Sequence, residues 1–214
     1  MGLSVKDSGG GFVPIPSGVY PARCIGVIDL GTQIVHFDGE EKQQHKVLLQ
    51  WEVFGEDEAG VPLTKEVNGH ERPLTVSKRY TATLSAKGKL RPDLEAWRGR
   101  AFTKEELDGF KLAALLGAPC LLNITQAERD NRTYANVSSI TPMPKGMPKP
   151  VSDTPLVSFD IDAPDVPSPE LVLLEDCAEC HVVAGRRCET WWGAMHGAWH
   201  LPRVEAARAK LPAP

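Results

Sequence analysis

The stretch Lys46-Val-Leu-Leu-Gln-Trp-Glu-Val-Phe54 decides the fold class of this chain. Its apolar side chains recur at every second position, which is the period of a β-strand with one buried face. Two other stretches, Val19 to Asp29 and Leu74 to Leu84, alternate in the same way. The sequence therefore predicts three strands that share a core. The core residues of the first stretch are Val47, Leu49, Trp51 and Val53.

A helix is predicted after the third of these strands. The segment Thr103-Lys-Glu-Glu106 has the capping-box pattern, and Phe102 and Leu107 are placed to form a hydrophobic staple around the helix start. We expect the helix to run to about Leu116, because Gly117 suits the left-handed conformation that ends many helices.

Two further strands complete the first domain. Cys120, Leu122 and Ile124 alternate as a strand, and residues 133–140 return as its hairpin partner after a polar turn. Five strands with one helix before the fourth are the inventory of the oligonucleotide-binding barrel, the OB-fold. The predicted fold class is therefore mainly β, a five-stranded OB-like barrel with one inserted helix. The periodicity alone also fits other small β-rich arrangements.

Charges and prolines divide the chain. The formal net charge is -4, but residues 151–176 hold seven Asp or Glu and no Lys or Arg, so the acidity lies in one short segment. Eight prolines between residues 142 and 169 block regular helices and sheets, and they predict an extended linker. We predict a tail over 1–11, a first domain over 12–144, a Pro-rich acidic linker over 145–173, a small module over 174–208 and a tail over 209–214.

The C-terminal module has the spacing of a metal site. Cys177 and Cys180 form a CxxC pair, Cys188 follows, and His196 or His200 can supply the fourth ligand. Zinc takes four such ligands in a tetrahedron, and a site filled by protein ligands is structural. Ordinary buried thiols are one alternative, but so short a polar segment has no apolar core to hold them. A redox CxxC is another, which the third cysteine and the lack of a βαβ pattern disfavour.

The same module resembles a zinc-binding domain frequent in actinobacterial and phage proteins. The match rests on the three cysteines, on Gly185, Thr190 and Gly193, and on His200-Leu-Pro-Arg203. The resemblance implies a structural Zn²⁺ held by Cys177, Cys180, Cys188 and His200. Three nearby tryptophans form either a miniature core around the metal or a base-stacking surface, and these are Trp191, Trp192 and Trp199.

A basic stretch of the first domain points to nucleic acid. Residues 78–100 hold seven Lys or Arg against two acidic residues. Cations beside exposed aromatic rings bind single strands without reading their sequence. A solvated charged face is the alternative, and Trp51 also shares its phase with core residues. The candidate contacts are Lys46, Trp51, Lys78, Arg79, Tyr80, Lys87, Lys89 and Arg91.

The first domain also resembles the phage-encoded single-stranded DNA-binding proteins that accompany phage recombinases. The resemblance rests on Ser17 to Gln33, Val47 to Val53, Ser77 to Thr81 and Leu116 to Ile124. It implies an OB-fold that coats single-stranded DNA, without strong sequence preference, during phage replication or recombination. The sequence leaves open whether RNA competes with DNA and whether the chain forms a homo-oligomer.

The acidic linker is a candidate partner-binding segment. Phe159, Asp160, Ile161 and Asp162 place apolar side chains among carboxylates. This arrangement resembles the acidic tails through which such binders recruit replication partners, so recombinase or replication proteins are the expected partners. A solvated linker that only preserves solubility is the alternative.

An enzyme is not predicted. A zinc-dependent nuclease needs an open metal position or a His base beside a carboxylate cluster, and the sequence shows neither. The alternative function is a zinc-stabilised protein-binding adaptor, or a phage inhibitor of a host system, without affinity for DNA. The sequence has no signal-peptide pattern and no run of roughly 20 apolar residues, so no membrane contact is expected. The expected location is the cytoplasm, that of the host cell if the protein is phage-encoded.

Overall fold

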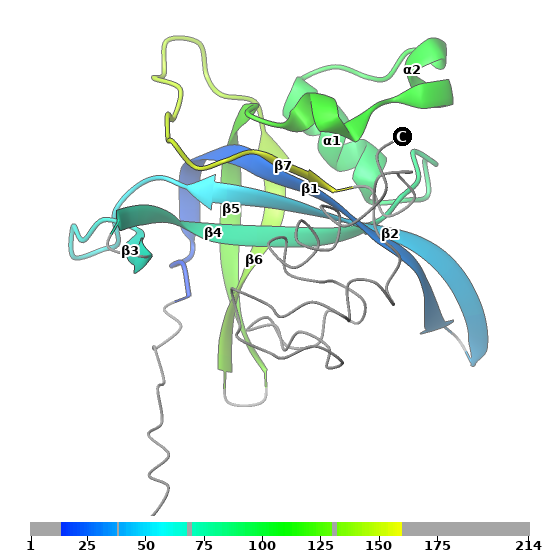
Figure 1. Ribbon diagram of the computed structural model, residues 1–214, viewed down its shortest axis with the longest axis horizontal. Coiled ribbons are helices and arrows are strands. Elements are labelled where there is room, and N and C mark those ends of the chain that lie inside the picture. Colours follow the sequence, from blue (N-terminus) through cyan, green and yellow to red (C-terminus); the bar gives the residue numbers. More distant parts are fainter. Residues whose placement is uncertain (1–13, 38, 68–69, 130–131, 160–214) are drawn as a thin grey trace, which may run out of the picture.

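The structure, a computed structural model, describes residues 14–37, 39–67, 70–129 and 132–159. This part of the chain is mainly β, with a curled, largely antiparallel sheet that forms a half-barrel, and with few helices (Figure 1). The predicted zinc module and both predicted tails lie outside these residues.

Seven strands form the sheet of the described residues. Six follow one another in the order β3-β4-β2-β1-β5-β6, and β7 adds to β1 as the single parallel pair. The five predicted strands are confirmed as β1, β2, β4, β5 and β6, with β3 and β7 in addition. The bounds are β1 Gly18–Phe37, β2 Glu40–Val53, β3 Thr64–Val67, β4 His70–Thr81, β5 Pro119–Arg129, β6 Arg132–Thr141 and β7 Val157–Phe159.

Two irregularities in β1 help to curl the sheet. The register between β1 and β2 shifts between Cys24 and Gly26, and again between Asp29 and Gly31. Such bulges bend a strand and increase its twist. Strand β1 pairs with β5 before the first bulge and with β7 after it.

The core fills the inside of the half-barrel. Every second side chain of the central strands points inward, and Trp51 at its centre has no exposed surface. Its ring lies against the ring of Trp97, with 5.9 Å between the centroids. Burial of these apolar surfaces is the main stabilising contribution to the fold. The strand residues of the core include Ala22, Cys24, Val27, Val47, Leu49, Trp51, Val53, Val76, Tyr80, Cys120, Leu122, Ile124, Val137 and Ile140.

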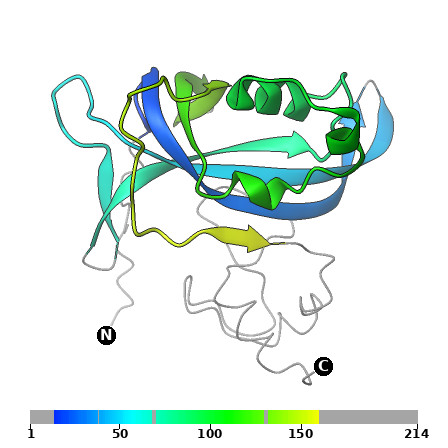
Figure 2. The same ribbon diagram turned by 90° about the horizontal axis from the view of Figure 1, so that it is seen from above.

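The helical elements are α1 Leu90–Arg98, α2 Lys104–Gly109 and the 3₁₀ turn η1 Leu112–Leu115, and Figure 2 shows them together on one side of the curled sheet. Helix α1 was not expected, although Leu90, Leu94 and Trp97 have helical spacing and are its buried residues. None of the helices in the described residues is long and apolar enough to cross a membrane.

The single helix predicted for residues 103–116 is wrong in length. Its capping box is confirmed, because the Thr103 hydroxyl accepts from the Glu106 backbone N–H and the Glu106 carboxylate accepts from the Thr103 N–H. Helix α2 nevertheless ends at Gly109, a residue with low helix propensity, and Phe110 is extended with its ring 5.1 Å from that of Phe102. Gly117 has the predicted left-handed conformation, with φ of 75°.

Part of the predicted linker packs on the half-barrel, and residues 150–159 are here called the strap. Arg23 Nη1 donates to the Ser152 carbonyl at 2.9 Å, and Arg23 Nη2 donates to the Thr154 carbonyl at 3.0 Å. Arg72 pairs with Asp153. The strap then continues as β7 beside β1 (Figure 2). The prediction that the prolines block sheet pairing throughout was wrong for residues 157–159, which no proline interrupts.

Candidate nucleic-acid interface

The outer face of β1, β2 and β4 is the side of the sheet opposite the core. Paired residues on neighbouring strands point to the same side, and alternate residues along one strand point to opposite sides. The register therefore assigns each side chain to a face. The outer face is formed by Arg23, Gly26 and Ile28 of β1, by Gln44, Lys46, Leu48, Gln50 and Glu52 of β2, and by Thr75, Ser77, Arg79 and Thr81 of β4.

Two cations lie close together on this face. Lys46 Nζ donates to Gln44 Oε1 at 2.6 Å and to Thr81 Oγ1 at 3.0 Å. Partial burial, and secondly the charge of Arg79, lower the pKa of Lys46. Within the described ranges neither Lys46 nor Arg79 pairs with a carboxylate. Two neighbouring uncompensated cations beside amide and hydroxyl groups can bind a phosphate.

The loop after β4 carries two more of the predicted contacts. Lys87 and Lys89 are exposed, and no ion pair of the described residues involves them. The loop is ordered by its own hydrogen bonds, in which the Gly88 N–H donates to the Ser85 carbonyl at 2.9 Å and the Ser85 N–H donates to Thr83 Oγ1 at 3.1 Å. These two lysines are exposed cations in the loop that follows β4.

Lys78 and Tyr80, two of the predicted nucleic-acid contacts, do not belong to the outer face. Both alternate with Arg79 and point inward, where Lys78 Nζ and the Tyr80 hydroxyl each lie 2.8 Å from Asp93 Oδ2. Tyr80 keeps only 3% of its surface exposed, so its ring has no free face for a base. Burial, followed by the bond to Asp93, raises the pKa of Tyr80.

Trp51 and Arg91 are also poor candidates for contact. Trp51 lies wholly in the core, as the alternative interpretation has it, and its ring has no exposed face for a base. Arg91 Nε donates to Glu95 Oε1 at 2.9 Å along α1, so a phosphate has to compete with that carboxylate. Four of the eight predicted contacts remain as exposed or uncompensated cations: Lys46, Arg79, Lys87 and Lys89.

The predicted partner contacts are described only at their first residue. Phe159 ends β7 and pairs with Ile28 of β1, which puts it on the sheet instead of in a free linker. Asp160, Ile161 and Asp162 lie outside the described residues, as do the predicted zinc ligands Cys177, Cys180, Cys188 and His200.

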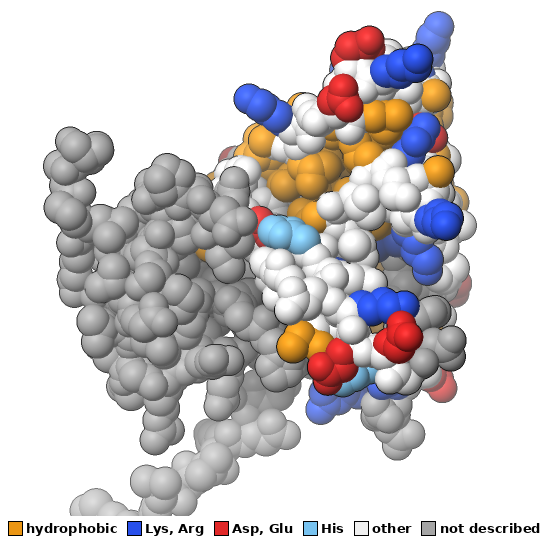
Figure 3. Space-filling view, turned by 90° about the vertical axis from the view of Figure 1, so that its right-hand side faces the viewer, with side chains coloured by type: hydrophobic (Ala, Val, Ile, Leu, Met, Phe, Trp, Pro, Cys, Tyr) orange, Lys and Arg blue, Asp and Glu red, His pale blue; other side chains and the backbone are white. Residues whose placement is uncertain are grey.

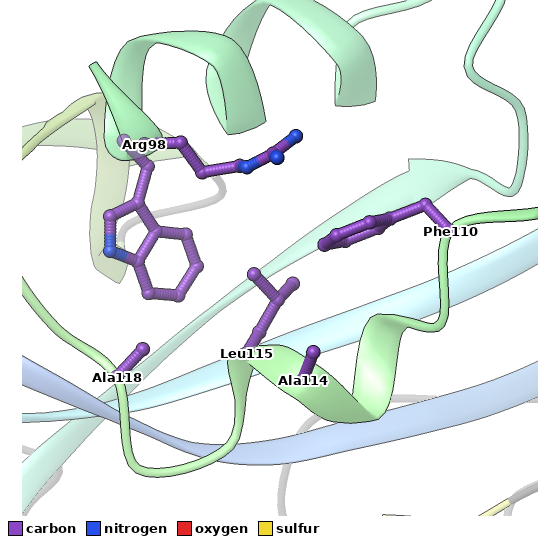
Figure 4. A pocket seen from close by; sticks show the side chains of 6 residues that line it. Arg98, Phe110, Ala114, Leu115 and Ala118 are labelled. Carbon is purple, nitrogen blue, oxygen red and sulfur yellow. The ribbon is translucent and has the colours of Figure 1, made fainter. Parts of the chain in front are cut away.

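A cavity of about 320 Å³ lies away from the outer face, beside α1 and η1 (Figure 4). Its lining is apolar apart from the guanidinium of Arg98. Figure 3, which views the right-hand side of Figure 1, shows hydrophobic side chains gathered at the helical end of the molecule. The lining residues are Trp97, Arg98, Phe110, Ala114, Leu115 and Ala118.

Arg98 is held over two aromatic rings at this cavity. Its Cζ lies 4.3 Å from the ring centroid of Phe102 and 5.1 Å from that of Phe110. Its Nη2 donates to Glu106, whereas its Nη1 is buried and has no hydrogen-bond partner among the residues that the structure describes. The cavity can therefore hold an apolar side chain and offer one donor to an oxygen beside it, which suits a peptide better than a phosphodiester.

The described residues hold no cluster of three or more His, Cys, Asp or Glu side chains placed to bind a metal. Cys24 and Cys120 are free thiols buried in the core. Burial raises the pKa of Cys24 to about 12 and raises that of Cys120 as well, so both thiols are protonated and unreactive at neutral pH.

Several polar residues of the outer face were missed in the sequence. Gln44 and Thr81 meet at Lys46, and Ser77 lies opposite Gln50, only because β2 and β4 pair in this register. No spacing in the sequence signals that register. No protein-family model matches the chain, and no curated protein matches it. Its function therefore has to be inferred from the geometry of the site.

Proposed function

We propose that this chain binds single-stranded DNA along the outer face of β1, β2 and β4. The observation that carries the proposal is the pair Lys46 and Arg79, two neighbouring cations that have no carboxylate partner among the described residues. They suit the backbone phosphates of a single strand, because a polyanion releases its counterions when such cations bind it. Lys87 and Lys89 continue the path.

We further propose that the half-barrel is an OB-fold. Strands β1, β2 and β4 form a meander, α1 precedes the last two long strands, and β5 returns beside β1. The second and third strands of an OB-fold present the face that binds oligonucleotides, and here these strands are β2 and β4, which carry Lys46 and Arg79. No ladder joins β4 to β6 among the described residues, so the barrel is open there.

The proposed binding is tolerant of sequence. The side chains of the outer face that can reach phosphates are cations, hydroxyls and amides. The sugar-phosphate backbone of a single-stranded DNA presents the same phosphate groups whatever its base sequence. Such a protein coats single strands, and we propose that it does so in phage replication or recombination. The recruitment of recombinase or replication proteins through residues 159–162 belongs to the same proposal.

The test is binding of a fluorescent oligo-dT, measured by anisotropy across a salt titration, with a duplex of equal length. We expect tight binding of oligo-dT that weakens steeply with salt, and weaker binding of the duplex. Arg79→Ala should weaken the binding of oligo-dT, whereas Lys104→Ala, which removes an exposed cation of α2, should not. Absence of oligo-dT binding at low salt would exclude the proposed function.

A protein-binding adaptor is the second candidate, and the cavity beside Arg98 favours it. The unpartnered Nη1 and the apolar lining suit an acceptor-bearing peptide with one bulky apolar residue. Ala114→Trp fills the cavity from an exposed position. If the cavity is the functional site, this variant loses a partner that wild type retains, while its affinity for oligo-dT is unchanged.

We also propose that Cys177, Cys180, Cys188 and His200 hold a structural Zn²⁺. The proposal is supported by the spacing of three cysteines within twelve residues of a polar segment. A structural ion there stabilises a module too small to fold around an apolar core.

A further inference from the structure

A row of four side chains crosses the outer face from β7 to β4. Phe159 pairs with Ile28, Ile28 pairs with Leu48, and Leu48 pairs with Arg79. Paired residues point to the same side of a sheet, so these four side chains lie on one face. The row begins with an aromatic ring, crosses two aliphatic side chains and ends with a cation.

The dimensions of the row suit a nucleotide chain. Neighbouring strands lie about 4.8 Å apart, so the backbones at Phe159 and Arg79 are about 14 Å apart. Arg79 is exposed and Phe159 is half-buried, while Leu48 between them keeps 7% of its surface exposed. The row therefore has an apolar middle, with a ring at one end and a guanidinium at the other.

The strap fixes the position of the ring. Arg23 holds the carbonyls of Ser152 and Thr154 with its two terminal nitrogens, and its Nε donates to Glu52 Oε1 at 2.7 Å. These bonds tie down the chain a few residues before Phe159, and the β1 ladder holds Phe159 itself. A ring that is already placed loses less conformational entropy when a ligand binds.

Phe159 is the aromatic residue that the register places beside the outer-face residues named above. Trp51 and Tyr80, the two aromatic contacts expected from the sequence, are buried in the core. None of the residues named above as the outer face is aromatic. We infer that Phe159 supplies the face on which a base stacks, while Arg79 and Lys46 hold phosphates. This inference rests on the proposed function, and it adds a role in nucleic-acid binding for Phe159 to the proposed protein contact.

The inference is tested by comparing two ligands of equal length, oligo-dT and the same backbone with abasic sites. Phe159→Ala should weaken oligo-dT binding roughly ten-fold or more, in the range for losing one stacked base. Phe159→Leu keeps an apolar side chain against Ile28 and should also weaken oligo-dT binding, whereas Phe159→Trp should retain it.

Binding of the abasic strand should not change in any variant. The salt dependence of oligo-dT binding should stay that of wild type, because no charge is removed. Ser158→Ala, on the other face of β7, is the matched control.

Two results would overturn the inference. Phe159→Ala and Phe159→Leu could bind oligo-dT as tightly as wild type, or they could lose oligo-dT and the abasic strand equally, which indicates a role in placing the strap. In either case wild type still binds oligo-dT and the proposed function stands. Failure of wild type itself to bind oligo-dT overturns the proposed function, and the inference with it.

Discussion

Arg23 and Glu52 form an ion pair of 2.7 Å that is almost withdrawn from solvent, with 13% and 1% of their side-chain surfaces exposed. Within the described part of the chain Glu52 Oε2 has no hydrogen-bond partner, and Arg23 is the cation that pairs with this carboxylate. Arg23→Ala leaves a buried charge unpaired, and it should lower the free energy of unfolding by about 3–5 kcal/mol, measured by urea denaturation. The double variant with Glu52→Gln should recover part of that loss. A loss below about 1 kcal/mol in the single variant would contradict the burial of the pair.

The second prediction concerns Lys78 and Arg79, whose side chains lie on opposite faces of β4. Lys78→Met should leave oligo-dT affinity unchanged, because its Nζ is engaged by Asp93 inside the half-barrel. Arg79→Ala should weaken binding by about 1 kcal/mol, or about five-fold, through the loss of one phosphate contact. Anisotropy titrations at one salt concentration measure both. Equal losses in the two variants would show that the two side chains share a face, contrary to the register.

Lys78 and Arg79 also show which features of the site can be predicted from the sequence and which cannot. Side chains alternate between the two faces along β4, so the predicted contacts Lys78, Arg79 and Tyr80 belong to opposite faces and do not form one surface. Only the pairing of β4 with β2 settles which side Arg79 occupies. The capping box at Thr103 was predicted correctly, because both of its bonds are local.

Other features depend on contacts distant in sequence. The short parallel pair between Phe159 and Ile28 joins residues far apart in the chain, and three strand residues carry no periodicity that could reveal it. Helix α1, which begins with Leu90 and has Pro92 in its first turn, was not predicted. The basic residues among its three buried apolar residues favoured an exposed loop. The candidate site was therefore half predicted. The cations were visible in the sequence, whereas their assignment to faces and the ring beside them were not.

The third prediction concerns acid stability at Glu106. Hydrogen bonds, first from Arg100 and then from the Thr103 backbone, lower the pKa of Glu106 from 4.5 to about 2. A carboxylate whose pKa is lowered on folding stabilises the fold above its unfolded pKa, and this contribution is lost as pH falls toward the folded pKa. The melting temperature should therefore fall between pH about 4.5 and about 2, and Glu106→Gln should show a smaller fall. Parallel curves for the two proteins would exclude this role for Glu106.

The fourth prediction separates the five cysteines into two classes. Cys24 and Cys120 are buried thiols with raised pKa values, so iodoacetamide should not label them in the folded protein at pH 8. If Cys177, Cys180 and Cys188 hold zinc, they should be protected until a chelator removes the ion. Mass spectrometry should then show labelling at these three alone, with release of about one zinc ion per chain. Full labelling of the three without a chelator would contradict the proposed zinc site.

The binding of oligo-dT by wild type and by Lys46→Ala/Arg79→Ala, each across a salt titration, tests the central claim most directly. Single-strand binding loses about 0.7 in the slope of log K against log salt for each phosphate contact removed. We therefore expect the double variant to bind more weakly and with a slope shallower by about 1.4. Wild-type affinity and slope in the double variant would contradict the assignment of the outer face as the nucleic-acid interface.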